Sequence, residues 1–190
     1  MKLMIASDIH GSAYYCKKML EAYKKEEADR LLLLGDILYH GPRNDLPKDY
    51  NPKECIAMLN PMKEHLLCVR GNCDTEVDQM VLEFPILADY CFLELDGHTI
   101  FATHGHHHNP KNPPMLKKGD ILLNGHTHIP AHQDNGTFIY MNPGSVSIPK
   151  ENSAHGYMIY DGEFHWKQLD GTEIPMPLSS TLFYINYAFH

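Results

Sequence analysis

The sequence predicts an α/β fold in which mixed sheets form a sandwich with helices on the outside. The first half of the chain alternates apolar strand-like segments with amphipathic helical ones, whereas the second half is mostly strand-like segments separated by turn residues. The chain has 190 residues, which suits one domain with a substantial core. We expect a single domain over residues 1–178 and a tail over 179–190, whose aromatic, nearly uncharged segment could add a strand, contact another protomer or be poorly ordered.

The first half is expected to begin with a βαβ unit. Residues 2–7 and 30–35 are short apolar runs typical of buried strands, and residues 11–29 between them place apolar side chains at helical spacing. This order favours two parallel strands joined by a right-handed crossover. The next elements are expected to be a loop over 39–53, a helix over 52–60 that Pro61 ends or kinks, a strand over 65–71 and a short helix over 75–82.

The second half is expected to contain hairpins. Asp96-Gly97 and Asp161-Gly162 each separate two apolar runs, and this dipeptide is a strong hairpin signal. Further strands are predicted over 120–125, 137–142 and 156–171.

Composition argues against several classes of function. The net charge of −8 disfavours non-specific binding to nucleic acid, because phosphate backbones attract an excess of lysine and arginine. The five cysteines are odd in number and form no C-x-x-C pair, so they indicate reduced thiols and a cytoplasmic location. No run reaches the roughly 18 apolar residues of a membrane span, so we expect no membrane partner.

Potential metal ligands follow five of the apolar runs. In four of the five, a glycine or serine stands directly before the first ligand. Taken singly, these residues would be ordinary turn residues or satisfied histidines. Because ligands bind beyond the carboxyl ends of strands in open α/β sheets, five such strand ends together predict one site. Its members are Asp8, His10, Asp36, Asn72, His104, His126 and His128.

This ligand set indicates two metal ions. Carboxylate, amide and imidazole ligands without thiolate fit Mn²⁺, Fe, Ni²⁺ or Zn²⁺ better than Ca²⁺ or a structural zinc site. Seven ligands are too many for one ion and suit two ions that share a carboxylate. Two ions about 3.5–4 Å apart would polarise a phosphoryl group and generate hydroxide at neutral pH.

The ligand-bearing motifs resemble those of a known family. In order along residues 1–165, "DIHG", "GDILYHG", "RGNCD", "THGHH" and "NGHTH" resemble the signature blocks of calcineurin-like metallophosphoesterases, especially small bacterial phosphodiesterases. The resemblance implies a four-layer α/β/β/α sandwich, two divalent ions, most often Mn²⁺, and a homo-oligomer. It also implies that Asp8, His10, Asp36 and His128 hold one ion, that Asp36, Asn72, His104 and His126 hold the other, and that Asp36 bridges them.

One position departs from the family pattern. Many relatives have "GNH" where this chain has "GNC", and the histidine is taken to protonate the leaving oxygen. Cys73 would be a weaker donor, or a small side chain with no chemical task. His106 or His40 could act as the acid or bind the phosphate instead. Arg70 could pair with a phosphate oxygen or form only a surface salt bridge.

The leading hypothesis is therefore a metal-dependent phosphodiesterase in which metal-bound hydroxide attacks a small phosphodiester substrate. A phosphomonoesterase, including a phosphoprotein phosphatase, could use the same metals, and the loops over 39–53 and 106–118 would decide between them. A non-catalytic scaffold of the same fold is a third possibility, although the complete ligand set argues against it. A nuclease is disfavoured because the basic run "KNPPMLKK" is typical of a solvated loop.

Overall fold

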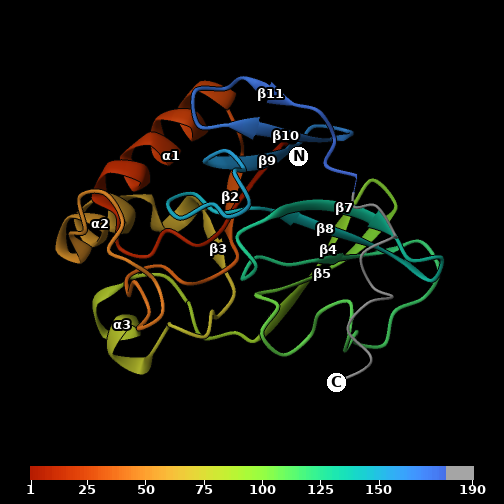
Figure 1. Cartoon of the computed structure of the whole chain (residues 1–190), viewed down its shortest axis with the longest axis horizontal. Coiled ribbons are helices and arrows are strands. Elements are labelled where there is room, and N and C mark those ends of the chain that lie inside the picture. The colour runs from red at the N-terminus through yellow and green to blue at the C-terminus, as the bar shows by residue number, and fades with distance from the viewer. Residues whose placement is uncertain (179–190) are drawn as a thin grey trace.

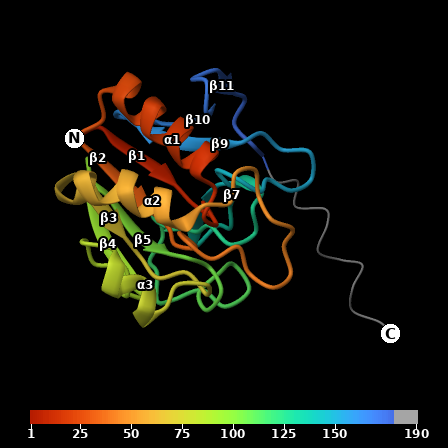
Figure 2. The ribbon, with the colours of Figure 1, turned by 90° about the vertical axis from the view of Figure 1, so that its left-hand side faces the viewer.

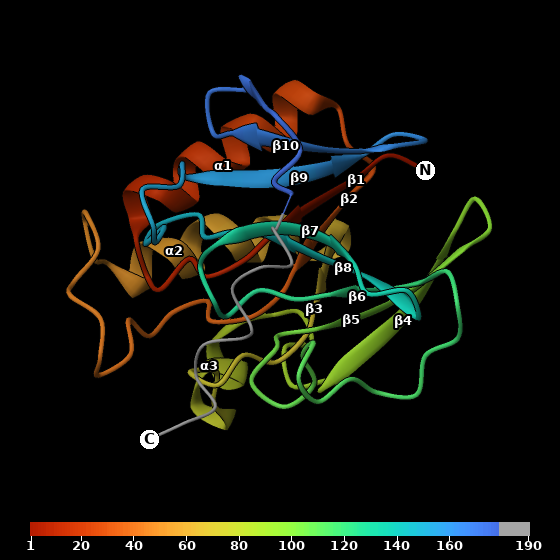
Figure 3. The same cartoon turned by 45° about the vertical axis from the view of Figure 1, so that its right-hand side comes forward.

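The computed structural model describes residues 1–178, and these form two mixed β-sheets packed face to face (Figure 3). The first sheet has the strand order β11-β10-β9-β1-β2-β3 in this part of the chain. Its strands are β1 (Leu3–Ala6), β2 (Arg30–Leu33), β3 (Leu66–Cys68), β9 (Gly156–Tyr160), β10 (Phe164–Gln168) and β11 (Glu173–Ile174). The second sheet has the order β4-β5-β6-β8-β7. Its strands are β4 (Tyr90–Leu95), β5 (His98–Thr103), β6 (Asp120–Leu123), β7 (Pro130–Asp134) and β8 (Phe138–Pro143).

The predicted βαβ unit is present at the start of the chain. β1 pairs in parallel with β2, and β2 pairs in parallel with β3. Between β1 and β2 lies α1 (Ala13–Glu26), whose first turn is capped because the Ser12 side chain accepts a hydrogen bond from the Tyr15 N–H. The helix ends where Glu27 adopts a left-handed conformation, with φ of 53°. Its apolar residues, spaced as the sequence indicated, face the sheet.

Both predicted hairpins are present. β4 and β5 pair antiparallel across Asp96-Gly97, whose φ values of 48° and 85° are those of a tight primed turn. β9 and β10 likewise pair antiparallel around Asp161 and Gly162. Both sheets are mixed, as expected: the first has parallel pairs at the β3 edge and antiparallel pairs elsewhere, and the second has parallel pairs at its centre and antiparallel pairs at its edges.

Helices cover the outer face of the first sheet (Figures 1 and 2). α1 and α2 (Pro52–Leu59) bury Cys16, Met19 and Cys55 in one apolar cluster with residues of β1 and β2. As expected, α2 ends just before Pro61, and the chain continues as the 3-10 helix η1 (Asn60–His65), where proline in the first turn costs no hydrogen bond. α3 (Glu76–Val81) is short and begins with a capping box between Thr75 and Asp78.

The interior of the sandwich is a second apolar cluster, to which both sheets contribute. Leu3 and Leu32 of the first sheet pack in it with Ile121 of the second. The indole of Trp166 on β10 donates a hydrogen bond of 2.8 Å to the carbonyl of Asn142 on β8, which ties the two sheets together. The outer face of the second sheet carries a smaller cluster, against which Leu116 from the loop between β5 and β6 packs.

The five predicted ligand segments follow β1, β2, β3, β5 and β6, so both sheets deliver residues to one end of the sandwich. The apolar segment 181–189 lies outside the described residues, and the expected boundary between domain and tail stays a prediction. Within the described part of the chain, no helix is long and apolar enough to cross a membrane.

Candidate metal centre

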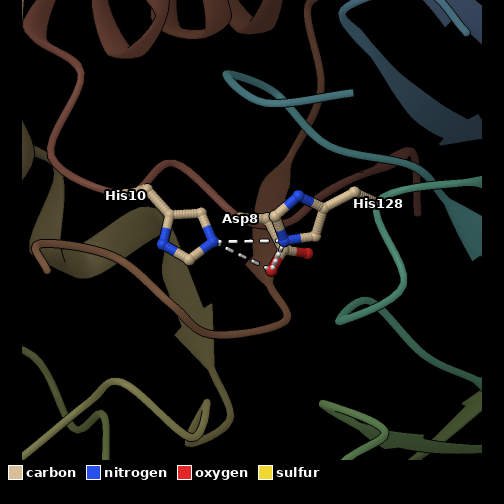
Figure 4. A group of neighbouring side chains, drawn as sticks. All are labelled: Asp8, His10 and His128. Atoms are coloured by element: carbon tan, nitrogen blue, oxygen red, sulfur yellow. Dashed lines mark hydrogen bonds and ion pairs between the residues drawn. The ribbon is translucent and has the colours of Figure 1, made fainter. Parts of the chain in front are cut away.

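Asp8 and His10, just after β1, meet His128 from a distant part of the chain (Figure 4). The Nε2 atoms of His10 and His128 lie 3.2 Å apart, and they lie 3.5 and 3.1 Å from Asp8 Oδ1. Ligands bound at about 2.0–2.2 Å to one ion stand about 3 Å from each other, so these separations suit a common ion.

The remaining ring nitrogens of these histidines show which atoms face the centre. His10 Nδ1 lies 2.8 Å from the carbonyl of Tyr39, and His128 Nδ1 lies 2.7 Å from the carbonyl of Ile148. A carbonyl accepts but cannot donate, so each Nδ1 carries a hydrogen, and each Nε2 faces Asp8 Oδ1 and the other ring. An ion bound at this point would take the lone pairs of both Nε2 atoms. A second hydrogen bond from the far nitrogen is also the usual arrangement of a metal-bound histidine.

Asp8 divides its two oxygens between different tasks. Oδ2 accepts hydrogen bonds from the Ser7 hydroxyl at 2.6 Å and from the His126 N–H at 3.0 Å. Oδ1 is buried and accepts no hydrogen bond from the described residues, so it is free to bind a cation. Burial alone would raise the pKa of Asp8, but His10 and His128 hold it well below its usual value. The side chain is therefore a carboxylate.

A second cluster lies beside the first and contains Asp36, Asn72, His104 and His126. His104 Nε2 is 3.3 Å from Asp36 Oδ2, 3.1 Å from Asn72 Oδ1 and 3.2 Å from His126 Nδ1. His104 Nδ1 lies 2.7 Å from the carbonyl of Leu34, which again directs its Nε2 toward the cluster. Asp36 Oδ2 is also 3.7 Å from His10 Nε2, so this one oxygen stands between the two clusters.

The electrostatics of the site call for positive charge. Asp8 and Asp36 are both almost fully buried, and two buried carboxylates require compensating cations. Burial by itself lowers the pKa of His104, but the hydrogen bond with Asp36 and the charges of Asp8 and Asp36 outweigh it and raise the pKa to about 9. Because carboxylate, amide and imidazole donor atoms converge around two buried carboxylates, the residues fit two divalent ions.

The backbone at the strand ends is held in an uncommon conformation. Five of the seven predicted ligands have left-handed φ values, between 49° and 66°. A non-glycine residue there carries a conformational cost and persists only where its surroundings enforce it. These five are Asp8, His10, Asp36, His126 and His128.

Residues outside the predicted set enforce this backbone. Asp74 is buried, and its carboxylate accepts hydrogen bonds from the N–H groups of Asp36 at 2.8 Å, Ile37 at 2.9 Å and Gly71 at 2.7 Å. It therefore joins the loop after β2 to the loop after β3. Sequence reasoning missed Asp74, although it is the last letter of the "RGNCD" block.

Serines support the loop after β1 in a similar way. The hydroxyls of Ser145 and Ser147 donate to the carbonyl of Asp8 at 2.9 and 3.0 Å, and Ser147 also lies 2.6 Å from the carbonyl of Ile9. No pattern around these two serines identified them in the sequence, because their partners lie more than 130 residues away.

Two of the glycines before the ligands are required by close packing. A Cβ on Gly71 would overlap the backbone and carboxylate of Asp36, and a Cβ on Gly125 would overlap the Ser7 hydroxyl. Neither glycine has a positive φ. At these two positions a glycine is needed because neighbouring segments approach closely.

The clusters open into a pocket of about 420 Å³, called here the metal pocket. His10, Asp36, Asn72, His126 and His128 line it.

Two cations, Arg43 and Lys150, also line the metal pocket and lie at its exposed side. Arg43 belongs to the loop over 39–53 that was expected to shape the pocket. Lys150 carried no signal in the sequence.

Of two further predicted site residues, Cys73 lies in the metal pocket and Arg70 lies outside it. Cys73 lines the metal pocket, and its N–H donates to Asp36 Oδ1 at 2.8 Å. The Arg70 guanidinium donates to the Asp74 carbonyl at 3.2 Å and lies 3.6 Å from Glu76, so it makes the surface salt bridge considered as its alternative role. Arg70 does not line the pocket.

The two candidate acids among the histidines lie at the edges of the site. The His106 ring centroid is 5.4 Å from that of His104 and 6.2 Å from that of His126. Burial, reinforced by the charge on His104, lowers the pKa of His106 to about 4, so its ring is neutral. His40 packs edge-to-face against Tyr39 and Tyr50. The catalytic roles of both stay predictions.

The Cys73 thiol is protonated in this environment. Burial and the Asp36 carboxylate raise its pKa to about 12. Bound cations would lower this value, since they offset the charge on Asp36. A neutral thiol suits the predicted role of weak proton donor and disfavours a cysteine nucleophile.

Comparison with known proteins agrees with this geometry. Residues 1–163 match the model of the calcineurin-like phosphoesterase superfamily domain. The chain is 46% identical over 163 residues to phosphodiesterase YfcE of Escherichia coli K12, covering 86% of this chain and 89% of that protein. The solved structure of YfcE, a phosphoesterase from E. coli, superposes with a TM-score of 0.88 at 44% identity, covering 92% of this chain and 97% of the other. These matches confirm the resemblance and the fold class predicted from the motifs.

A more distant match shows the fold alone. The structure of vacuolar protein sorting 29 from Cryptosporidium parvum has a TM-score of 0.59 at 18% identity, covering 91% of this chain and 94% of the other. At that identity the likeness says nothing about activity.

Proposed function

Because the chain belongs to the calcineurin-like phosphoesterase superfamily, we propose that it is a metal-dependent phosphodiesterase with a two-metal centre. The observation that carries the proposal is the convergence of carboxylate, amide and imidazole donor atoms at the strand ends. Asp8 Oδ1 is buried and accepts no hydrogen bond among the described residues, and the Nε2 atoms of His10 and His128 face it and each other. The relative that is 46% identical is named a phosphodiesterase.

The ligand assignment follows from the two clusters. Asp8, His10 and His128 would hold one ion, and Asn72, His104 and His126 would hold the other. Asp36 would bridge them through Oδ2, which lies 3.7 Å from His10 Nε2 and 3.3 Å from His104 Nε2. When bound, two divalent ions polarise a phosphoryl group and lower the pKa of water so that hydroxide forms at neutral pH.

The chain's own residues supply the remaining functions. Arg43 and Lys150 would attract the anionic phosphodiester into a pocket within an otherwise acidic protein. Cys73 would place a neutral thiol beside the leaving oxygen, where it offers only a weak hydrogen bond. Such an enzyme would act best on esters whose leaving group needs little protonation.

The proposal also covers the metal, the cellular location and the oligomeric state. Mn²⁺ is the expected metal, since nitrogen and oxygen ligands without thiolate suit it, although Zn²⁺, Fe or Ni²⁺ would fit the same donors. The five free cysteines support a reducing, cytoplasmic location. A homo-oligomer is expected from the family resemblance.

The experiment is hydrolysis of a chromogenic phosphodiester and its matching monoester by metal-stripped protein with Mn²⁺ added back. We expect metal-dependent turnover that favours the diester. Preference for the monoester would instead support a phosphatase on the same centre. Failure to bind two ions would support a scaffold and refute the proposed function.

A further inference from the structure

A second cavity, called here the apolar groove, opens beside the metal pocket. Its volume of about 350 Å³ falls within the roughly 300–1,000 Å³ typical of small-molecule sites. The loop after β2, the start of α2 and the helix α3 form its walls. The side chains that make it apolar are Leu38, Tyr39, Tyr50, Ile56, Val77 and Val81.

The apolar groove adjoins the metal pocket. Cys73 lines both cavities. It directly follows Asn72, a member of the second ligand cluster, and its N–H donates to Asp36. The groove therefore begins at the edge of the ligand clusters. A substituent attached to a phosphoryl group in the metal pocket reaches the groove by passing Cys73.

The apolar wall is exposed in a way that packing does not explain. Val77 is 68% exposed, Val81 is 44% exposed and Tyr39 is 41% exposed. Val77 and Val81 are four residues apart, so they lie on the same side of α3. This helix buries none of its residues, so the two valines add little to the core. An exposed apolar surface that does not serve the core is typical of a binding site.

Charge separates the groove from the neighbouring pocket. Asp78 is the only charged residue lining the groove in the part of the chain that the structure describes. Its carboxylate already accepts hydrogen bonds from the N–H and hydroxyl of Thr75. The groove thus offers no cation to an anionic group, whereas Arg43 and Lys150 line the metal pocket. The metal pocket therefore suits the charged phosphoryl group of a phosphodiester, and the apolar groove suits an uncharged substituent on it.

We propose that the apolar groove binds one neutral aromatic ester substituent of the substrate while the metal pocket holds the phosphoryl group. This inference rests on the proposed function and narrows its substrate class. Tyr39 and Tyr50 supply aromatic surface, and flat rings pack well against such side chains.

The test measures binding of dimethyl phosphate and diphenyl phosphate to the Mn²⁺-loaded protein by calorimetry. Both probes are phosphodiesters with one negative charge, and only their substituents differ. We expect diphenyl phosphate to bind at least about tenfold more tightly, because burying a ring removes apolar surface from water. Val77→Ser and Val81→Ser should each reduce this affinity ratio by about threefold.

Met80→Ser is the matched control. Met80 is 83% exposed on the same helix but does not line the groove, so its substitution should leave the ratio unchanged. Equal binding of the two probes, or equal effects of Met80→Ser and Val77→Ser, would overturn the subsite while diester hydrolysis still supported the proposed function. Absence of both binding and diester hydrolysis would refute the proposed function and the subsite with it.

Discussion

The floor of the metal pocket and its outer wall are built on different principles. The floor consists of the ligand residues, which are mostly buried and held in left-handed backbone conformations by hydrogen bonds from distant segments. The term outer wall covers Arg43 and Lys150, at the exposed side of the metal pocket, together with the exposed residues of the neighbouring apolar groove. The floor is buried and tied to other segments by hydrogen bonds, whereas Arg43, Lys150, Val77 and Val81 of the wall are exposed. The floor would therefore determine the chemistry and the wall the substrate.

Removing a ligand from the floor should have the largest effect. Asp36→Ala should lower turnover by at least about a hundredfold, because Asp36 Oδ2 faces both clusters. His126→Ala should act similarly through one cluster. Metal content and turnover of the purified variants would check this, with circular dichroism as the control for folding. Undiminished turnover by a folded variant would contradict the ligand assignment.

A substitution at Asp74, which supports the loops that carry the ligands, should have the second-largest effect. Asp74→Asn replaces one carboxylate oxygen with an NH₂ group that must face backbone N–H groups of Asp36, Ile37 or Gly71. We expect Mn²⁺ affinity to fall about tenfold to a hundredfold, as is typical when support for metal ligands is lost. Titration with Mn²⁺ would measure it. Asp134→Asn, at an exposed strand end far along the second sheet, should leave the affinity unchanged.

Cys73 lines both the metal pocket and the apolar groove, and its substitution should have the third-largest effect. Cys73→His would place a better proton donor in the pocket. We expect kcat to rise about tenfold for diesters with poor leaving groups and to change little for good ones, because only poor leaving groups need protonation. A series of aryl phosphodiesters with leaving groups of different pKa would show this. Equal changes across the series would mean that Cys73 does not limit protonation.

A charge on the wall should have the smallest effect. Arg43→Ala should raise KM about threefold with little change in kcat, since an exposed charge attracts the substrate without touching the reaction. The effect should shrink as salt is added, because ions screen exposed charges. Arg30→Ala removes an equal charge that instead contacts the Glu64 carbonyl, and it serves as the control. A large fall in kcat for Arg43→Ala would place this residue on the floor.

The sequence analysis succeeded where patterns are local. Apolar runs, helical spacing and the Asp96-Gly97 turn signal depend on neighbours a few residues apart, so they predicted the βαβ unit and the hairpins. The seven candidate ligands were predicted to lie together because each stands a few residues beyond a strand, and the structure does bring these strand ends to one edge.

Other features depended on tertiary contacts. Asp74, Ser145 and Ser147 act through hydrogen bonds to backbone groups that lie far away in the chain or in neighbouring loops, and no spacing in the sequence reports such bonds. The position of Arg70 also depended on tertiary contacts. Its guanidinium contacts the Asp74 carbonyl and Glu76, and it does not line the metal pocket.

The sequence by itself determined the fold class, the family and which side chains are candidates for metal binding, because strand periodicity and motif order are written along the chain. Only the tertiary structure decided which oxygen of Asp8 stays free, how Asp36 stands between the two clusters, and which exposed residues line the apolar groove. The physical reason is that orientation and cavity shape arise from packing between the two sheets and their loops, and such packing joins residues that the sequence keeps apart.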